Sequence, residues 1–391
     1  MRRMFKPASI PMGVRWHADA TDPALDRLTP FATSYFNRVR RCTLDSTTGE
    51  ITGFYGEVSP STFYDGTDEV MVQFPKMYYK NVLDPSAGSR HMEPMLSETP
   101  RPGYKLHPAW VVNSVERPFI YASAFEGSNG AGDKLRSIAN AGVLVSQTET
   151  VFRTRAQARN ADPSSRAADG LGWQLLDYNT LAALQMLFII DNATLDSQSK
   201  FRGRVDTTSA CKTGYTSSIN VDSAGKNVDT GNGSGESTQG AGLASFAWRG
   251  IENFWGNVHN WTDGIKFLSY DVWVADHGFD DTDPSSTPGA YINVSDVGGG
   301  VGVMVAGGWF VLTDILYSSA YDYLFLPKSA PASLDYTTYF CDGDYTTHTG
   351  LTALFSGGAW DSAAGAGAFL ALAHAAASSS YAYVGGRLVF K

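Results

Sequence analysis

The chain has 391 residues, of which 43% are hydrophobic, 13% aromatic and only 18% charged. This composition is that of a folded chain with a sizeable core, and it excludes a disordered one. The formal net charge of −9, from 30 basic and 39 acidic residues, argues against binding of a nucleic-acid backbone, because that task needs a dense basic surface. The length fits one elaborated domain with a small accessory one.

The cysteines and the N-terminal stretch exclude further classes. Cys42, Cys211 and Cys341 are odd in number and far apart, so they predict free or buried thiols and no disulfide framework or metal knuckle. The opening "MRRMFKPASIPMGVRW" has no apolar run of signal-peptide length, and no later stretch approaches the ~18 apolar residues of a membrane span. We expect a soluble protein, made in the host cytoplasm and without membrane insertion.

The first third of the chain is predicted to be rich in β-strands. Residues 47–50 have the composition of a hairpin turn between two strands. The stretch "EVMVQFPKMYYKNV" alternates apolar and polar residues until Pro75, which indicates a strand that is broken at its end or lies at a sheet edge. The stretches "GYKLHPAWVV" and "RPFIYASAFEG" predict two further strands.

Two helices follow. "TETVFRTRAQAR" predicts one that carries Arg153, Arg155 and Arg159. "DYNTLAALQMLFIIDN" is apolar nearly all round over residues 181–190, which is typical of a buried central helix rather than of a surface helix. Asp177 or Asn179 is its predicted N-cap.

After a Gly/Ser/Thr-rich stretch over residues 206–245, predicted to be a long loop, patterned sequence resumes with "WRGIENFWGNVHNWTDGI". The apolar residues Ile251, Phe254, Val258 and Trp261 are spaced by three, four and three, which predicts a short amphipathic helix. Short strands are predicted in "KFLSYDVWVAD", in "GVGVMVAGGWFVL" and in the C-terminal segment.

Three signatures stand in order along the second half of the chain: "GNVHNW" at 256–261, "SGGAW" at 356–360 and "VGGRLV" at 384–389. They resemble those of the C-type-lectin-like fold, in the branch shared by formylglycine-generating enzymes and the variable proteins of diversity-generating retroelements. The stretches "DEVMVQFPKMYYK", "GYKLHPAW", "DYNTLAALQMLFIIDNATLDSQ" and "RGIENFWGNVHNWTDGI" resemble bacteriophage tail and prophage proteins that carry this fold. The likeness extends from about residue 53 to residue 391.

The resemblance implies an α+β domain with two main helices, small antiparallel sheets and long loops, preceded by a β-rich N-terminal segment. We expect residues 1–60 to be a mounting segment for assembly and residues 61–391 to be the C-type-lectin-like domain, with the binding face in 356–391. The residues expected to form the structural signature of the fold are Trp255, Asn257, Trp261, Gly358 and Arg387.

The last segment, "YAYVGGRLVF", suggests how a binding face is built. If it is extended, Tyr381 and Tyr383 share one face, while Val384, Leu388 and Phe390 build a hydrophobic frame. Tyrosine offers a large, rigid, amphipathic contact at low entropic cost. In the variable proteins the corresponding stretch carries the diversified contacts, so the resemblance implies these ligand-binding residues: Trp360, Asp361, Ser362, His374, Ser379, Tyr381 and Tyr383. The alternative is that the two tyrosines cover the core or a subunit interface, and that Trp360 packs under the face.

Other chemistries have weaker support in the sequence. Cys341 is the only cysteine of the last third, which argues against a formylglycine-generating enzyme, and "EPM" and "WTD" only approximate the calcium-lectin tripeptides. The turn at 276–283, with Asp276, Asp280, Asp281 and Asp283, is interpreted as a solvated loop, and Glu252 with Asp263 is a weak glycosidase pair. None of the histidines has metal-ligand spacing; they are His17, His91, His107, His259, His277, His348 and His374.

From these observations we expect no catalytic residue, no metal and no cofactor. The predicted function is that of a phage tail adhesin, located on the virion at a tail tip, fibre or baseplate, which binds a bacterial surface saccharide or protein non-covalently. The alternative is a structural tail or baseplate component that binds other virion proteins. We expect a homo-oligomer, in particular a trimer, because several linked copies of a modest site raise avidity.

Overall fold

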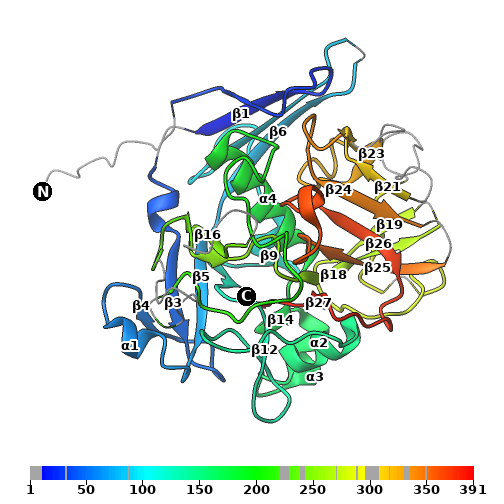
Figure 1. The fold of residues 1–391 in the computed structure, drawn as a ribbon. Helices are drawn as coiled ribbons and strands as arrows, with labels where there is room; N and C mark the ends of the chain where they lie inside the picture. Colours follow the sequence, from blue (N-terminus) through cyan, green and yellow to red (C-terminus); the bar gives the residue numbers. More distant parts are fainter. Residues whose placement is uncertain are drawn as a thin grey trace, which may run out of the picture.

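The computed structural model describes residues 11–30, 33–86, 88–217, 219, 229–237, 243–269, 271–287, 289–295, 308–316, 318–329, 335–347 and 350–391. Strands dominate the described chain and four α-helices accompany them, so the predicted mixed α+β class is confirmed (Figure 1). No helix among these residues is long and apolar enough to cross a membrane.

A six-stranded antiparallel sheet lies on one side of the molecule (Figure 1). The predicted hairpin at 47–50 is confirmed, because the strands on either side of it pair with each other. The strand that ends at Pro75 lies inside the sheet, so the proline terminates it and the alternative of an edge position is wrong. In spatial order the strands are β14 (Trp173–Leu175), β28 (Leu388–Phe390), β11 (Phe119–Ser123), β5 (Glu69–Pro75), β3 (Arg40–Leu44) and β4 (Ile51–Phe54).

An eight-stranded sheet, drawn in yellow to red, lies on the other side (Figure 1). It is mostly antiparallel, but β24 runs parallel to β26 and β27 (Val384–Gly385) runs parallel to β18. In spatial order the other strands are β20 (Ile292–Asn293), β19 (Asp271–Val274), β18 (His259–Leu268), β25 (Leu351–Ser356), β26 (Ala371–Ala375), β24 (Gly343–Thr346) and β21 (Gly308–Val311). Most of "GVGVMVAGGWFVL" lies outside the described residues.

Smaller sheets complete the β-structure. One has five strands: β2 (Asp26–Arg27), β1 (Met12–His17), β7 (His91–Ser97), β6 (Tyr78–Asp84) and β8 (Lys105–Leu106). One has three: β15 (Gly235–Glu236), β16 (Phe246–Trp248) and β17 (Ile251–Glu252). The two-stranded pairs are β9 (Val111–Val112) with β10 (Val115–Glu116), β12 (Ser128–Asn129) with β13 (Leu135–Arg136), and β22 (Asp314–Ile315) with β23 (Pro327–Ser329).

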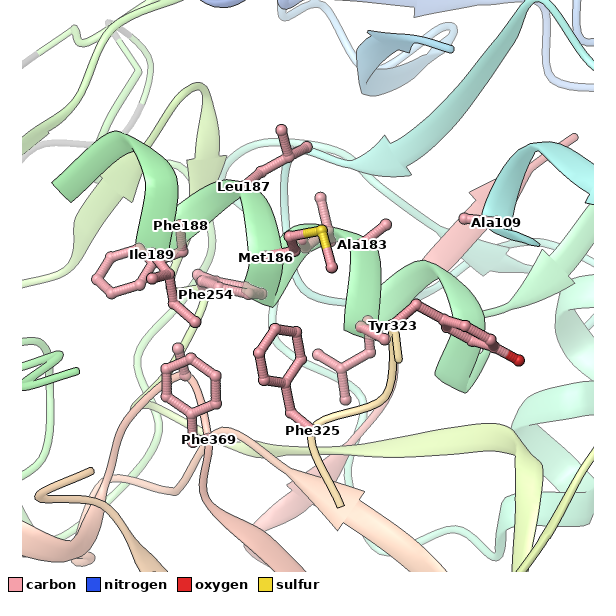
Figure 2. Packing of buried hydrophobic residues seen from close by; sticks show 14 of the residues in the cluster. Ala109, Ala183, Met186, Leu187, Phe188, Ile189, Phe254, Tyr323, Phe325 and Phe369 are labelled. Atoms are coloured by element: carbon pink, nitrogen blue, oxygen red, sulfur yellow. The ribbon is translucent and has the colours of Figure 1, made fainter. Parts of the chain in front are cut away.

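The central helix α4 (Tyr178–Asn192) is buried on all sides, as predicted, with every residue from 178 to 190 inaccessible. Asp177 is its N-cap: its carboxylate accepts hydrogen bonds from the Thr180 backbone N–H and hydroxyl at 3.1 and 2.7 Å. Figure 2 shows Met186, Phe188 and Ile189 of α4 among Phe254, Phe325 and Phe369 of other segments. Such a helix is stable only because packing surrounds it, since it has no polar face.

The other helices are shorter. α2 (Glu149–Gln157) confirms the predicted arginine-bearing helix, capped by the Thr148 hydroxyl, which accepts from the Val151 N–H at 3.2 Å. α1 (Pro60–Phe63) and α3 (Pro163–Asp169) begin with a proline after a Ser and an Asp cap. In the stretch predicted as a strand at 103–112, a 3-10 turn η2 (Pro108–Trp110) separates β8 from β9, so that prediction is wrong in its middle.

The helix predicted over 251–261 is wrong. The segment forms β17, a series of bends and the start of β18. Asn253 and Asn257 have φ of 48° and 62°, and Gly256 has 79°, values that no right-handed helix admits. The apolar residues satisfy the helical spacing and are all buried, but Ile251 and Phe254 pack in one hydrophobic cluster and Trp261 in another, rather than along one stripe.

Other predicted segments can be placed. Strands β3 and β4, within residues 1–60, belong to the six-stranded sheet, and β1 pairs with β7. Residues 1–10 lie outside the described chain, and the mounting role stays a prediction. The described parts of 206–245 are loop except for β15.

Candidate functional site

A concave site of about 660 Å³ lies on the eight-stranded sheet, at the end formed by β21, β24 and β26. Its volume falls within the range of about 300–1,000 Å³ that is usual for small-molecule sites. We call it the aromatic pocket. It is lined by His259, Trp309, Tyr336, Tyr345, Asp361, Ser362, Leu372, His374 and Tyr383.

The register of the sheet builds the floor of the aromatic pocket. Trp309 of β21 pairs with Tyr345 of β24, Tyr345 pairs with Leu372 of β26, and Leu372 pairs with Phe355 of β25. Residues in register point to the same face of a sheet, so these side chains form one continuous row. The row passes from Trp309, which is 49% exposed, to Phe355, which is buried.

Tyr383 forms one wall of the aromatic pocket, and the Tyr381 ring stacks on it. The ring centroids lie 5.2 Å apart and the planes are inclined by 20°. Residues 382–383 form a turn and not an extended strand, so the two side chains meet by a different backbone path from the one predicted. Tyr383 also contacts His259 with centroids 5.8 Å apart, and both tyrosines pack partly buried against the core under the sheet.

The loop after β25 supplies Asp361 and Ser362. Gly358 starts it with φ of 91°, and a Cβ atom there would lie 2.6 Å from that of Ala366. The Ser362 hydroxyl accepts from the Ala359 N–H at 2.9 Å, and the Trp360 N–H donates to the Asn257 carbonyl at 3.0 Å. These bonds fix the loop while Asp361 stays exposed.

Electrostatically the aromatic pocket is nearly neutral. Burial, reinforced by the neighbouring His374, lowers the pKa of His259 to about 3, and burial also lowers the pKa of His374. Both imidazoles are therefore uncharged near neutral pH. Burial raises the pKa of Tyr383, so its phenol stays protonated. Asp361 is the only lining residue with a formal charge at neutral pH.

The predicted signature residues form the scaffold beneath the loops. Trp255, Trp261 and Asn257 are fully buried. The Asn257 amide donates to Glu126 Oε2 at 2.5 Å, and its oxygen accepts from the Cys211 N–H at 2.8 Å. Arg387 donates to the Glu252 carbonyl at 2.5 Å and to the Asn253 carbonyl, in keeping with its interpretation as a structural hydrogen-bond donor.

The structure brings only part of the candidate set together. Asp361, Ser362, His374 and Tyr383 line the aromatic pocket, and Tyr381 stacks on its wall. Trp360 and Ser379 are half-buried and do not belong to the lining. Sequence reasoning missed Trp309, Tyr336, Tyr345 and Leu372, and treated His259 only as part of a signature. Strand pairing brings most of these residues together, and no local motif marks it.

The two carboxylates considered as a glycosidase pair are both engaged by structural partners. Glu252 accepts from the Gly214 and Thr216 N–H groups at 2.6 and 2.7 Å, and Asp263 is paired with Arg153 at 2.7 Å. Both carboxylates are buried outside the aromatic pocket.

The acidic turn at 276–283 shows the expected side-chain-to-backbone bonds. Asp280 accepts from the Thr282 N–H at 3.0 Å, and Asp283 accepts from the Ser285 N–H at 2.8 Å. Asp280 also pairs with Lys266, and Asp281 with Arg153. Within the described residues, no group of three or more His, Cys, Asp or Glu side chains is arranged to hold a metal ion. All three cysteines are free, and His348 lies outside the described residues.

Fold and site together define a mixed α+β protein with a concave aromatic site on one face of its largest sheet. Two solved structures are similar to it. The Major Tropism Determinant M1 variant is 11% identical over 99% of this chain and 73% of that chain, with a TM-score of 0.30. The P3c variant of the same determinant is 10% identical over the same shares, with a TM-score of 0.29. No protein-family model matches the sequence, and no curated protein matches it.

Proposed function

We propose that this protein is a receptor-binding protein of a phage or prophage tail, with a C-type-lectin-like scaffold. It recognises a molecule on the bacterial surface non-covalently through the aromatic pocket. The observation that carries the proposal is that a single cavity gathers residues from seven separate stretches of the chain into one aromatic site with polar groups at its edge. The two similar solved structures are named as tropism determinants, which is a role of the same kind. The proposal is nevertheless argued from the geometry of the site.

The chemistry of the lining suits binding rather than catalysis. Neutral His259 and His374 lie close to tyrosine rings and not beside a nucleophile, since the lining holds no cysteine and the Ser362 hydroxyl is engaged by the Ala359 N–H. Rigid aromatic side chains give large contact areas at small entropic cost, and tyrosine and tryptophan dominate binding energies at interfaces.

The binding face is supported by a rigid frame. The strands that carry Tyr345, Leu372 and His374 are hydrogen-bonded inside the sheet, while Asp361 and Ser362 project from a loop anchored to the scaffold through Asn257. We propose that contacts on the face vary while this frame stays constant, and that several copies act together on the virion.

The test is binding of the purified full chain to a panel of bacterial cells, measured by flow cytometry. The variant combines Trp309→Ala with Asp361→Ala, two exposed positions whose replacement leaves the core intact. We expect it to bind about tenfold more weakly or worse. Ile292→Ala, exposed at the opposite edge of the same sheet, is the control and should bind like the wild type. Equal binding by all three proteins would contradict the assignment of the site. Binding to virion proteins alone would favour the structural alternative.

A further inference from the structure

Several polar side-chain atoms of the aromatic pocket have no hydrogen-bond partner in the described part of the protein. Among the described residues, the phenol oxygens of Tyr336, Tyr345 and Tyr383 make no hydrogen bond to the protein. Two buried tyrosines elsewhere show the contrast: Tyr35 donates to the Pro75 carbonyl at 2.8 Å, and Tyr79 donates to Asp322 at 2.6 Å. The three phenol groups of the aromatic pocket are therefore open to hydrogen bonds with a ligand.

His259 is the most telling of these groups. It is 3% exposed, and its Nδ1 atom is buried without a hydrogen-bond partner in the described chain. The Nδ1 atom of His374 is in the same state. An unpartnered buried polar atom costs about 1–3 kcal/mol, so two of them beside one cavity need an explanation. A neutral imidazole carries one donor and one acceptor, and a hydroxyl group likewise both donates and accepts.

The charge of the lining selects among ligands. Asp361 is acidic, and no lysine or arginine lines the aromatic pocket. The sequence stretches 296–307, 330–334 and 348–349, which adjoin lining residues along the chain, contain no lysine or arginine either. An anionic ligand would find no cation and would lose its hydration without compensation. An uncharged polar ligand meets no such cost.

The arrangement of the rings adds a shape requirement. Trp309 and Tyr345 have centroids 5.6 Å apart, and Tyr345 and His374 have centroids 4.8 Å apart. Together with the Tyr381–Tyr383 stack, they present flat apolar faces next to hydroxyl and imidazole groups. A pyranose ring has the matching form, because its C–H groups make an apolar face and its hydroxyls surround the rim.

We infer that the aromatic pocket binds an uncharged pyranose unit of a bacterial surface saccharide, with Trp309 and Tyr345 stacking on the sugar and His259, His374 and Tyr383 bonding its hydroxyls. The inference rests on the proposed function, which makes this cavity the receptor site. It goes further in committing to an uncharged saccharide as the main ligand, in place of an acidic saccharide or a protein epitope.

The first test uses single sugars and the full chain. Methyl glycosides of glucose, galactose, mannose and N-acetylglucosamine are compared with glucuronic acid and N-acetylneuraminic acid by saturation-transfer NMR. We expect at least one neutral glycoside to bind, and the acidic sugars to bind about tenfold more weakly or not at all. The affinity should change less than about twofold when salt is raised from low to several hundred millimolar, since no ion pair is involved. Preferred binding of an acidic sugar, or of none, would overturn the inference.

Two variants that keep a ring at each position test the polar contacts. His259→Phe and Tyr383→Phe should each weaken sugar binding by about tenfold, while the melting temperature stays the same or rises because no bonded group is removed. If His259→Phe fails to fold, Tyr383→Phe alone decides. Unchanged sugar binding in a folded variant would contradict the assigned contacts.

A separate measurement distinguishes this inference from the proposed function. Envelope extract from a bound bacterium is treated with periodate, which cleaves vicinal diols of sugars, or with protease. Loss of binding after periodate and its retention after protease support the saccharide. The reverse result would overturn the saccharide and leave a receptor-binding protein with a protein ligand. If no cell in the panel and no sugar is bound, the proposed function and the inference both fail.

Discussion

Arg153 and Asp263 form a two-pronged ion pair in the interior, with Nε 2.7 Å from Oδ2 and Nη2 2.8 Å from Oδ1. The pair joins helix α2 to strand β18, and both side chains are almost inaccessible. Asp263→Ala removes the two-pronged partner and leaves the guanidinium its 3.4 Å contact with the buried Glu149 and its pair with Asp281, so we expect the free energy of unfolding to fall by about 3 kcal/mol, measured by urea denaturation. Asp281→Ala, which removes a more exposed carboxylate from the same arginine, should cost about 1 kcal/mol or less. Equal losses would show that burial does not decide the energy.

The stacked tyrosines are predicted to serve binding more than stability. Tyr381→Ala combined with Tyr383→Ala removes one wall of the aromatic pocket, and we expect binding to cells to be lost. Both rings are only half-buried, so the double substitution should lower the free energy of unfolding by about 1–2 kcal/mol. Replacing a fully buried aromatic side chain by Ala would lower it by about 3–5 kcal/mol. A melting curve checks this, and the double Phe variant, which keeps both rings, is the control for stability. A double Ala variant that is largely unfolded would place the tyrosines in the core.

Glu126 predicts a pH dependence of stability. Burial raises the pKa of its carboxyl from 4.5 to about 7, although Arg387 and Asn257 oppose the shift. At a pH between these two pKa values, the folded protein keeps a proton on Glu126 that the unfolded chain has lost. The free energy of unfolding therefore falls as the pH rises from about 4.5 to about 7, by a total on the order of 3 kcal/mol from this group. Glu126→Gln should flatten the fall in urea denaturation at several pH values. Glu57→Gln, at an exposed position, should leave the profile unchanged, and an identical profile for Glu126→Gln would refute the assignment.

Gly358→Ala should damage the loop that carries Asp361 and Ser362. Alanine at φ of 91° is strained, and its Cβ would lie 2.6 Å from that of Ala366. We expect a loss of about 2–4 kcal/mol in stability together with weaker binding. Gly350→Ala is the matched control, because its φ of 76° imposes strain with no atom within 4 Å of the added methyl group, and it should cost about 1 kcal/mol. Similar costs for the two would mean that the clash is relieved by movement of the loop.

Chelation should leave receptor binding intact. The acidic residues at 276–283 are engaged by Lys266, Arg153 and nearby backbone N–H groups, so their charges have partners without a cation. We expect the protein to bind bacterial cells equally well before and after treatment with EDTA, measured by flow cytometry. A loss that calcium restores would identify this turn as a cation site and would change the proposed mechanism.

The sequence could predict those elements whose signal is local. Helix α4 is apolar over residues 181–190 and follows Asp177, so both its burial and its cap were predictable. Segment 251–261 has helical spacing too, yet Asn253 and Asn257 take left-handed φ, and the surrounding tertiary structure overrides the pattern.

The same distinction applies to the candidate site. Asp361, Ser362, His374 and Tyr383 lie in one C-terminal stretch, where a resemblance can mark them as a group. Trp309 and Tyr345 reach the aromatic pocket only through the pairing of β21 with β24 and of β24 with β26. Such register is set by contacts between distant parts of the chain, and no single-segment pattern encodes it.

The division of residues 384–390 between two sheets has a consequence for biosynthesis. β27 pairs with β18 in the eight-stranded sheet, and β28 lies between β14 and β11 in the six-stranded sheet. While the ribosome is still making the preceding residues, β11 and β14 lack the strand that joins them, and each exposes an unpaired edge. The nascent chain therefore cannot complete the six-stranded sheet until this segment emerges, and the open edges of β11 and β14 are sites of aggregation until then.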